Sequence, residues 1–105
     1  MANDKIRSKE LDDLFNGILT LETLDDCYMF FEDLCSMSEL KSFAQRFYVS
    51  RLLYEKVTYN AISYITKAST ATISRINRSL EYGNGGYVAV IERLNKKAEE
   101  EKEEK

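Results

Sequence analysis

Residues 58–80 read TYNAISYITKASTATISRINRSL and predict two helices joined by a tight turn. Thr58 is a candidate N-cap for the first helix, in which Ile62 and Ile65 are expected to be buried. Ser69 is a candidate N-cap for the second helix. Apolar residues at steps of three and four then indicate one buried face on the second helix, formed by Ile73, Ile76 and Leu80.

The opposite face of the second helix is small, polar and basic. Small side chains at the start of such a helix let its backbone come close to base edges, and arginines further along can reach guanine edges or phosphates. This arrangement is typical of a DNA-reading helix-turn-helix. The residues expected on this outward face are Ser69, Thr70, Ala71, Ser74, Arg75 and Arg78.

The net charge of −3 hides an uneven distribution along the chain. Residues 1–40 hold three basic and ten acidic residues, a net −7. Residues 41–80 hold seven basic residues and one acidic residue, a net +6, and residues 81–105 hold five basic and seven acidic residues, a net −2. Because a local patch decides whether phosphates are attracted, the acidic total does not exclude a nucleic-acid partner.

Length and composition favour one all-α domain. A chain of 105 residues can bury a core of modest size, and the absence of proline with only four glycines favours helices. We expect about six helices within a single domain over residues 1–95. Their expected ranges are 8–19, from 23 to 35, from 36 or 38 to about 56, the two helices within 58–82, and 87–95.

Local signals support these boundaries. Thr23 with Asp26 resembles a capping box, and Ser36 with Glu39 is a regular one. The glycine-rich residues 83–86 are expected to break the chain before the last helix. The tail at 96–105, KKAEEEKEEK, has no apolar stripe and is either a solvated helix end or disordered.

Several classes of protein are excluded by what the sequence lacks. No apolar run is long enough to cross a bilayer and no secretory signal is visible, so a cytoplasmic protein is expected. The chain has no histidine, no phosphate loop and no paired-carboxylate cleft, which argues against an enzyme. Cys27 and Cys35 fall about 12 Å apart on one predicted helix. They cannot form a disulfide there, and no metal or cofactor is expected.

The first two predicted helices carry more aromatic and aliphatic residues than a compact monomer of this length needs. Such a pair of helices, acidic on the outside, is suited to dimerisation, and the alternative is an ordinary monomer core. The dimerisation helices are expected within residues 8–56, with the homodimer formed through residues 8–35. The candidate interface residues are Leu14, Phe15, Ile18, Phe30 and Phe31.

The region 38–80 resembles the Trp repressor family. The resemblance rests on Arg51-Leu52-Leu53, on Ala71-Thr72-Ile73-Ser74-Arg75 and on Ser79-Leu80. The chain is most similar to the small Trp repressor-like proteins of Gram-positive bacteria, in which a Gly-Gly-Tyr motif, here residues 85–87, opens the last helix. The likeness covers most of residues 8–95.

The resemblance implies an all-helical homodimer in which the N-terminal helices of the two chains intertwine. The two helix-turn-helix motifs of the dimer, here called reading heads, would then enter successive major grooves of double-stranded DNA. It also implies which residues lie at or near the DNA, namely Asn60, Ser69, Thr70, Ala71 and Ser74.

The residues that form the family's tryptophan pocket are only partly matched in this sequence. The pocket uses two arginines, of which one matches Arg75, while the other falls on Gln45, with Arg46 adjacent. The family's glycine against which the indole packs is Ile76 here, and Ser79 matches the position that helps to hold the ligand's amino group. Tryptophan is therefore not expected to bind, and whether another small effector does stays open.

The turn of the motif also departs from the usual pattern. A helix-turn-helix usually has glycine where this chain has Lys67. A left-handed backbone costs a non-glycine residue about 1 kcal/mol. Either the turn geometry differs in this protein or that cost is tolerated.

The leading hypothesis is a dimeric, sequence-specific, DNA-binding transcription regulator. The alternative is a protein-interaction module in which the helix-turn-helix docks on the transcription machinery. The two hypotheses differ in the expected binding to duplex DNA. A DNA-binding regulator contacts phosphates, so its affinity depends on salt, whereas a protein-docking module would show no salt-dependent binding to a duplex.

Overall fold

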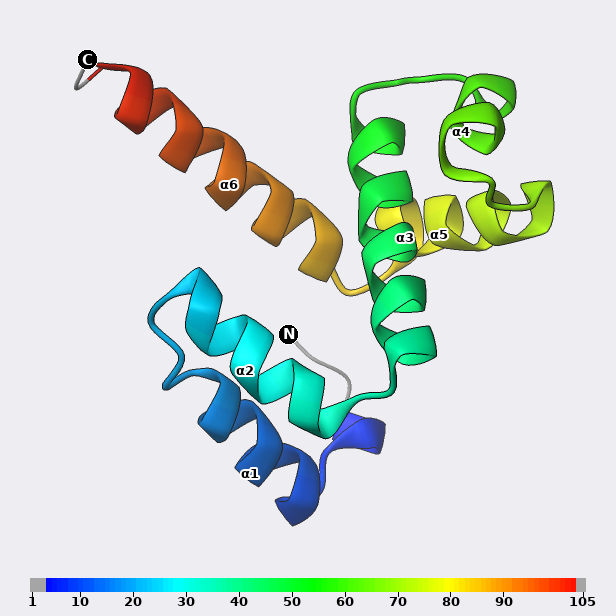
Figure 1. Ribbon diagram of the computed structural model, residues 1–105. Coiled ribbons are helices and arrows are strands. Elements are labelled where there is room, and N and C mark those ends of the chain that lie inside the picture. Colours follow the sequence, from blue (N-terminus) through cyan, green and yellow to red (C-terminus); the bar gives the residue numbers. More distant parts are fainter. Residues whose placement is uncertain (1–3, 104–105) are drawn as a thin grey trace. The chain divides into compact units, whose positions relative to one another are not determined.

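The structure is a computed structural model that describes residues 4–103. These residues form a short 3-10 helix and six α-helices, with no strand among them, so the all-α prediction is confirmed (Figure 1). The elements are η1 (Asp4–Ile6), α1 (Lys9–Ile18), α2 (Leu24–Leu34), α3 (Met37–Tyr54), α4 (Tyr59–Thr66), α5 (Thr70–Tyr82) and α6 (Gly86–Glu103).

Local capping sets where α1, α2 and α3 begin. The Ser8 hydroxyl accepts a hydrogen bond from the backbone N–H of Leu11 at 3.1 Å. Thr23 and Asp26 form the predicted capping box at the start of α2. Ser36 and Glu39 form a second box, with backbone-to-side-chain distances of 2.8 and 3.1 Å, so α3 begins after Ser36 and not after Ser38.

The carboxylate of the first capping box makes the stability of the protein depend on pH. The backbone N–H of Glu22, with help from Thr23, holds the pKa of Asp26 below its ordinary value. A lowered folded-state pKa stabilises the protein above the unfolded-state pKa, and this stabilisation is lost as the pH falls through the folded-state pKa. We expect Asp26→Asn to lower the melting temperature at pH 7 and to flatten its fall below about pH 4. Circular dichroism melts between pH 2 and 7 measure both effects.

The neighbouring Asp25 gives the control for this prediction. Asp25 is exposed and makes no capping hydrogen bond with Thr23. Asp25→Asn removes the same charge one residue away and should leave the acid limb of the melting curve as it is in the parent. Equal melting curves for Asp26→Asn and the parent would contradict the role of the cap.

The chain packs as two compact units that divide after Ser42. The first unit contains α1 and α2, and neither helix has a buried residue. The rings of Phe30 and Phe31 meet edge to face, with centroids 5.4 Å apart. Cys27 and Cys35 are free thiols, as expected for this spacing. Among its described residues, 4–42, the first unit thus has apolar side chains in contact but no buried core.

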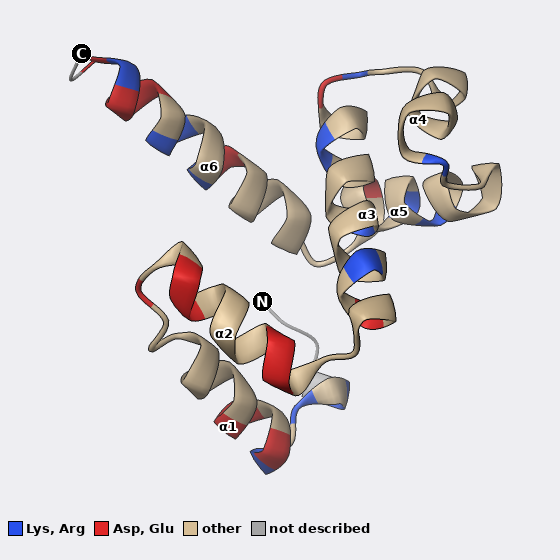
Figure 2. Ribbon diagram, viewed as in Figure 1, with Lys and Arg blue, Asp and Glu red and all other residues tan. Residues whose placement is uncertain are grey.

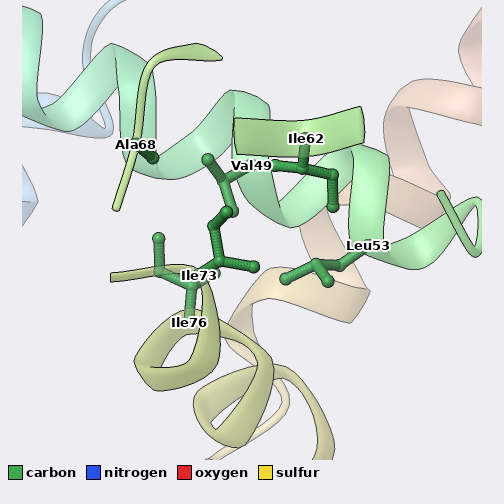
Figure 3. Close-up of a cluster of buried hydrophobic side chains, with 6 residues drawn as sticks. All are labelled: Val49, Leu53, Ile62, Ala68, Ile73 and Ile76. Atoms are coloured by element: carbon green, nitrogen blue, oxygen red, sulfur yellow. The ribbon is translucent and has the colours of Figure 1, made fainter. Parts of the chain in front are cut away.

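The second unit, from Phe43 onward, holds the core that α3, α4 and α5 share. Figure 3 shows these side chains converging from the three helices and from the turn between α4 and α5. The buried cluster comprises Val49, Leu53, Ile62, Ala68, Ile73 and Ile76. Leu80 packs against this cluster, so all three apolar residues predicted for the inner face of α5 are confirmed.

The prediction that Ile65 is buried is wrong, because 48% of its surface is exposed. Four residues turn a helix by about 400°, so Thr66 lies about 40° from the fully buried Ile62 around α4. Ile65 lies about 60° from Ile62 on the other side. The half-buried Thr66 therefore continues the inner face of α4, and Ile65 faces solvent.

The end of α3 also differs from the prediction by two residues. The helix ends at Tyr54, and Lys56 adopts a left-handed backbone with a φ of 67°. The N–H of Val57 then donates to the carbonyl of Leu52 at 3.0 Å, and that of Lys56 to the carbonyl of Leu53 at 3.0 Å. This pair of bonds is a Schellman closure, which stops a helix even when the left-handed residue is not glycine.

α6 joins the second unit through its first half. Ile91 is buried, the Arg51 guanidinium donates to the Asn95 side-chain oxygen at 2.9 Å, and the Tyr54 hydroxyl donates to Glu92 at 2.9 Å. The bond to Glu92 raises the pKa of the Tyr54 phenol.

The last helix is longer than residues 87–95. It begins at Gly86 and continues to Glu103, so of the two alternatives for the tail, the described part, 96–103, is an exposed helix end. Alanine, glutamate and lysine are strong helix formers, and neither glycine nor proline follows Gly86 to interrupt the helix. No helix within residues 4–103 is both long and apolar enough to span a membrane.

Candidate DNA-binding site

The turn between α4 and α5 is held by short-range hydrogen bonds. Lys67 has the left-handed conformation, with φ 64° and ψ 11°, and its N–H donates to the carbonyl of Ser63 at 2.9 Å. The Ser63 hydroxyl donates to the carbonyl of Ala68 at 2.8 Å, and the N–H of Ala68 donates to the Thr66 hydroxyl at 3.2 Å. The turn therefore has the left-handed geometry that is usual for this motif. The fold tolerates the conformational cost of a non-glycine residue at Lys67.

Side-chain caps fix the starts of the two helices. The Thr58 hydroxyl accepts from the N–H of Ala61 at 3.2 Å, and the Ser69 hydroxyl accepts from the N–H of Thr72 at 3.1 Å. Both N-caps were predicted from the sequence. With Ala68 buried beneath it, the start of α5 has a defined position on the core.

The residues predicted to contact DNA are all exposed, and most of them lie on the outward face of α5. Ile73 and Ile76 turn inward. Ser69 is exposed at the N-cap, and the predicted residues that are exposed on α5 itself are Thr70, Ala71, Ser74, Arg75 and Arg78. Asn60 is also exposed, in the first turn of α4. The helix thus gathers five of these residues on one side, with Ser69 at its N-cap, while Asn60 comes from the preceding helix.

The charges near this face are basic. Figure 2 shows lysine and arginine on α3, at the turn and on α5, whereas α1 and α2 carry mainly acidic residues and α6 carries charges of both signs. Glu55 is the single acidic residue between positions 43 and 80. Neither Arg75 nor Arg78 forms an ion pair with another residue in the range 4–103, so both can meet an external anion.

The residues of the possible effector pocket have different surroundings in the second unit. The Gln45 amide donates to the carbonyl of Thr66 at 3.1 Å, and the Arg46 guanidinium lies over the Phe43 ring, 4.9 Å from its centroid. Ile76 is 4% exposed and belongs to the core. Arg75 and Ser79 are exposed on α5. Gln45 and Ile76 therefore support the turn and the core from within.

Two residues beside the turn were missed in the sequence analysis as candidates for binding. Tyr64 is 79% exposed, and the Lys67 ammonium lies 5.0 Å from the centroid of its ring. Their spacing of three on a helix end is the only signal in the sequence that could have paired them.

The two capped helices, the ordered turn and the basic outward face of α5 define an all-α helix-turn-helix protein. The chain belongs to the Trp repressor protein family, whose model matches residues 9–95. Membership of this family indicates a DNA-binding transcription regulator.

Two solved structures agree with the family assignment, and a protein relative is also similar over most of its length. The chain is 53% identical over 94 residues to the uncharacterized protein YerC of Bacillus subtilis (strain 168), covering 90% of each chain. It is similar to the crystal structure of a TrpR-like protein from Eubacterium eligens, with a TM-score of 0.84 and 52% identity over 89% of this chain and 96% of that one. A structure from Staphylococcus aureus described as a candidate Trp repressor matches with a TM-score of 0.84 and 45% identity, covering 90% and 95% of the two chains.

Proposed function

We propose that this protein is a sequence-specific transcription regulator that binds double-stranded DNA as a homodimer through α4, the turn and α5. One observation carries the proposal: the side of α5 that faces away from the core is small at its start and basic further on. A helix of this kind can lie in a major groove with its N-terminal residues at the base edges.

The residues of the outward face take different roles in this proposal. Thr70, Ala71 and Ser74 meet base edges, because they are short and lie on the first turns of α5. Arg78 contacts phosphate, and Arg75 reaches either a guanine edge or a phosphate. Asn60 and Ser69 lie at the border of the contact.

The homodimer is supported by the first unit. α1 and α2 bury no residue, and 51% of the Phe15 side chain is exposed. Large exposed apolar patches mark interaction surfaces. A second copy is the proposed partner, as in the Trp repressor family. The proposed interface contains Leu14, Phe15, Ile18, Phe30 and Phe31.

The regulator is proposed to bind DNA without tryptophan. The Gln45 amide already has a partner in the Thr66 carbonyl, and Ile76 already fills its place in the core. The first contact holds the end of α4 at the turn, and the second holds the middle of α5 on the core. The reading head is therefore ordered by the chain itself, with no ligand needed.

We expect millimolar L-tryptophan to leave the affinity for duplex DNA unchanged. The replacement of a fixed arginine charge by Gln45 removes about 1.5–3 kcal/mol from binding of the ligand's carboxylate, and the buried Ile76 leaves no room for an indole. Calorimetry should show no binding heat, and the melting temperature should not rise with tryptophan. Tryptophan-dependent DNA binding would overturn this and would place Arg46 and Arg75 around a pocket with Ile76 turned away.

Selection of bound sites from a random duplex pool tests the proposed function. We expect one enriched sequence with two related halves, and an affinity that falls linearly with the logarithm of salt concentration. Absence of any salt-sensitive duplex binding would instead support a protein-docking role for the helix-turn-helix.

A further inference from the structure

We propose that Tyr64 and Lys67 form an additional DNA-backbone contact, with the Lys67 ammonium on a phosphate and the Tyr64 ring holding the lysine in place. This inference rests on the proposed function, since it extends the contact surface of α5 to the turn that precedes it. It adds two residues that the outward face of α5 does not include.

The backbone at the turn gives Lys67 a fixed direction. Its φ of 64° and the bond from its N–H to the Ser63 carbonyl hold its Cα, and the bonds of Ser63 and Thr66 to Ala68 hold the residue that follows. The side chain leaves this anchored position and crosses the Tyr64 ring, with the ammonium 5.0 Å from the ring centroid. The lysine stem is therefore more restricted than that of an ordinary surface lysine.

The fold does not need either side chain. Tyr64 is 79% exposed and lies outside the buried cluster, so its ring adds little to the core. Glycine adopts the left-handed conformation of position 67 without the strain that lysine bears there. Both residues are thus free to serve a role at the surface.

The charge on Lys67 is available to an external anion. No acidic side chain within the described residues forms an ion pair with Lys67. The ring face attracts the ammonium from one side, and its three N–H donors can still reach a phosphate oxygen. The phenol of Tyr64 is a further donor of the kind that contacts DNA phosphates.

The position of Lys67 in the chain matches the edge of a groove. It lies two residues before Ser69, the N-cap of α5. When the first turn of α5 enters a major groove, the residues just before it lie where the DNA backbone borders that groove. Lys67 would therefore neutralise a phosphate next to the bases that Thr70 and Ala71 meet.

The test is Lys67→Gly, measured by fluorescence anisotropy on a selected duplex over a range of salt. Loss of one phosphate contact should reduce the slope of log affinity against log salt by about 0.9 for each reading head. The affinity near 0.1 M salt should fall by roughly an order of magnitude for each reading head. The circular dichroism spectrum and melting temperature should stay close to those of the parent, because glycine suits this backbone.

Three further variants separate the parts of the proposal. Lys67→Arg keeps the charge and should keep the parent slope. Tyr64→Ala keeps the charge but loses the ring, and should weaken binding about two- to fivefold with little change of slope. Lys56→Gly removes the same charge at another exposed lysine with a left-handed backbone and should bind like the parent. Lys56 lines one open pocket together with Asn77 and Glu81 of the later part of α5.

The outcomes distinguish this inference from the proposed function. If the parent binds duplexes with a salt dependence and Lys67→Gly has the same slope and affinity, the inference is wrong and the proposed function stands. If Lys56→Gly loses as much slope as Lys67→Gly, the effect is one of general charge and the inference is also overturned. If the parent binds no duplex at all, the proposed function itself fails.

Discussion

Ala71→Glu is expected to abolish specific DNA binding and to leave the fold intact. Ala71 is exposed in the first turn of α5, at the place where the backbone is proposed to come closest to the bases. A glutamate there brings a carboxylate against the acceptor-rich groove and the phosphates. An acidic residue in the first turn of a helix is favourable to the helix itself, so the melting temperature should not fall. Anisotropy on the selected duplex measures the loss.

Ala98→Glu is the matched control for this substitution. Ala98 is an exposed alanine of α6 outside the proposed contact surface, and its replacement adds the same charge. It should bind within a few-fold of the parent.

Arg78→Ala should weaken binding to all sequences alike and lower the salt slope by about one for each reading head. Parent-like binding by both Ala71→Glu and Arg78→Ala would show that α5 does not enter the groove.

Phe15→Glu is expected to convert a homodimer into a monomer. The Phe15 ring is half exposed on α1, beside Leu14 and Ile18 on the same stripe, so in the free chain the substitution disturbs no core. In the proposed dimer it would bury a carboxylate at each of two equivalent positions, at a cost of about 3 kcal/mol or more. Sedimentation at micromolar concentration should report about twice the 12.2 kDa chain mass for the parent and a single chain mass for the variant.

Asn16→Glu gives the control on the same helix. Asn16 lies about 160° around α1 from Ile18, so its side chain points away from the apolar stripe. This variant adds the same charge and should remain a dimer. A monomeric parent at micromolar concentration would contradict the homodimer, and a dimeric Phe15→Glu would place the interface elsewhere on the chain.

Dimerisation and DNA affinity are expected to fall together in Phe15→Glu. Two linked reading heads bind one operator more tightly than either head alone, because the second contact becomes intramolecular. A monomer that kept the parent's affinity would mean that a single head suffices.

The all-α fold class and the first residues of the helices could be predicted from the sequence, because both depend on interactions between residues that are close along the chain. The hydroxyls of Thr58 and Ser69 accept hydrogen bonds from backbone groups three residues on, and the same separation joins Ser36 to Glu39. The outward face of α5 followed from a fixed turn of about 100° per residue. These features need no knowledge of distant parts of the chain.

Contacts between distant residues could not be predicted in this way. Ile65 has the spacing of a buried residue, but α4 turns its Ile62–Thr66 side to the core and leaves Ile65 half exposed. The bond from Gln45 to Thr66 crosses 21 positions, and the bond from Arg51 to Asn95 crosses 44. Periodicity along one helix does not say which way that helix is rotated against its neighbours.

The sequence by itself thus determined an all-α chain with a helix-turn-helix and a basic outward face, since capping and helical periodicity are local effects. The tertiary structure decided which side of α4 is buried and which distant groups Gln45 and Arg51 contact. It also decided that the turn keeps its left-handed form at Lys67. The physical reason is that packing of Ala68, Ile73 and Ile76 on α3 and α4 holds the turn in place, and short-range preferences give way to such packing.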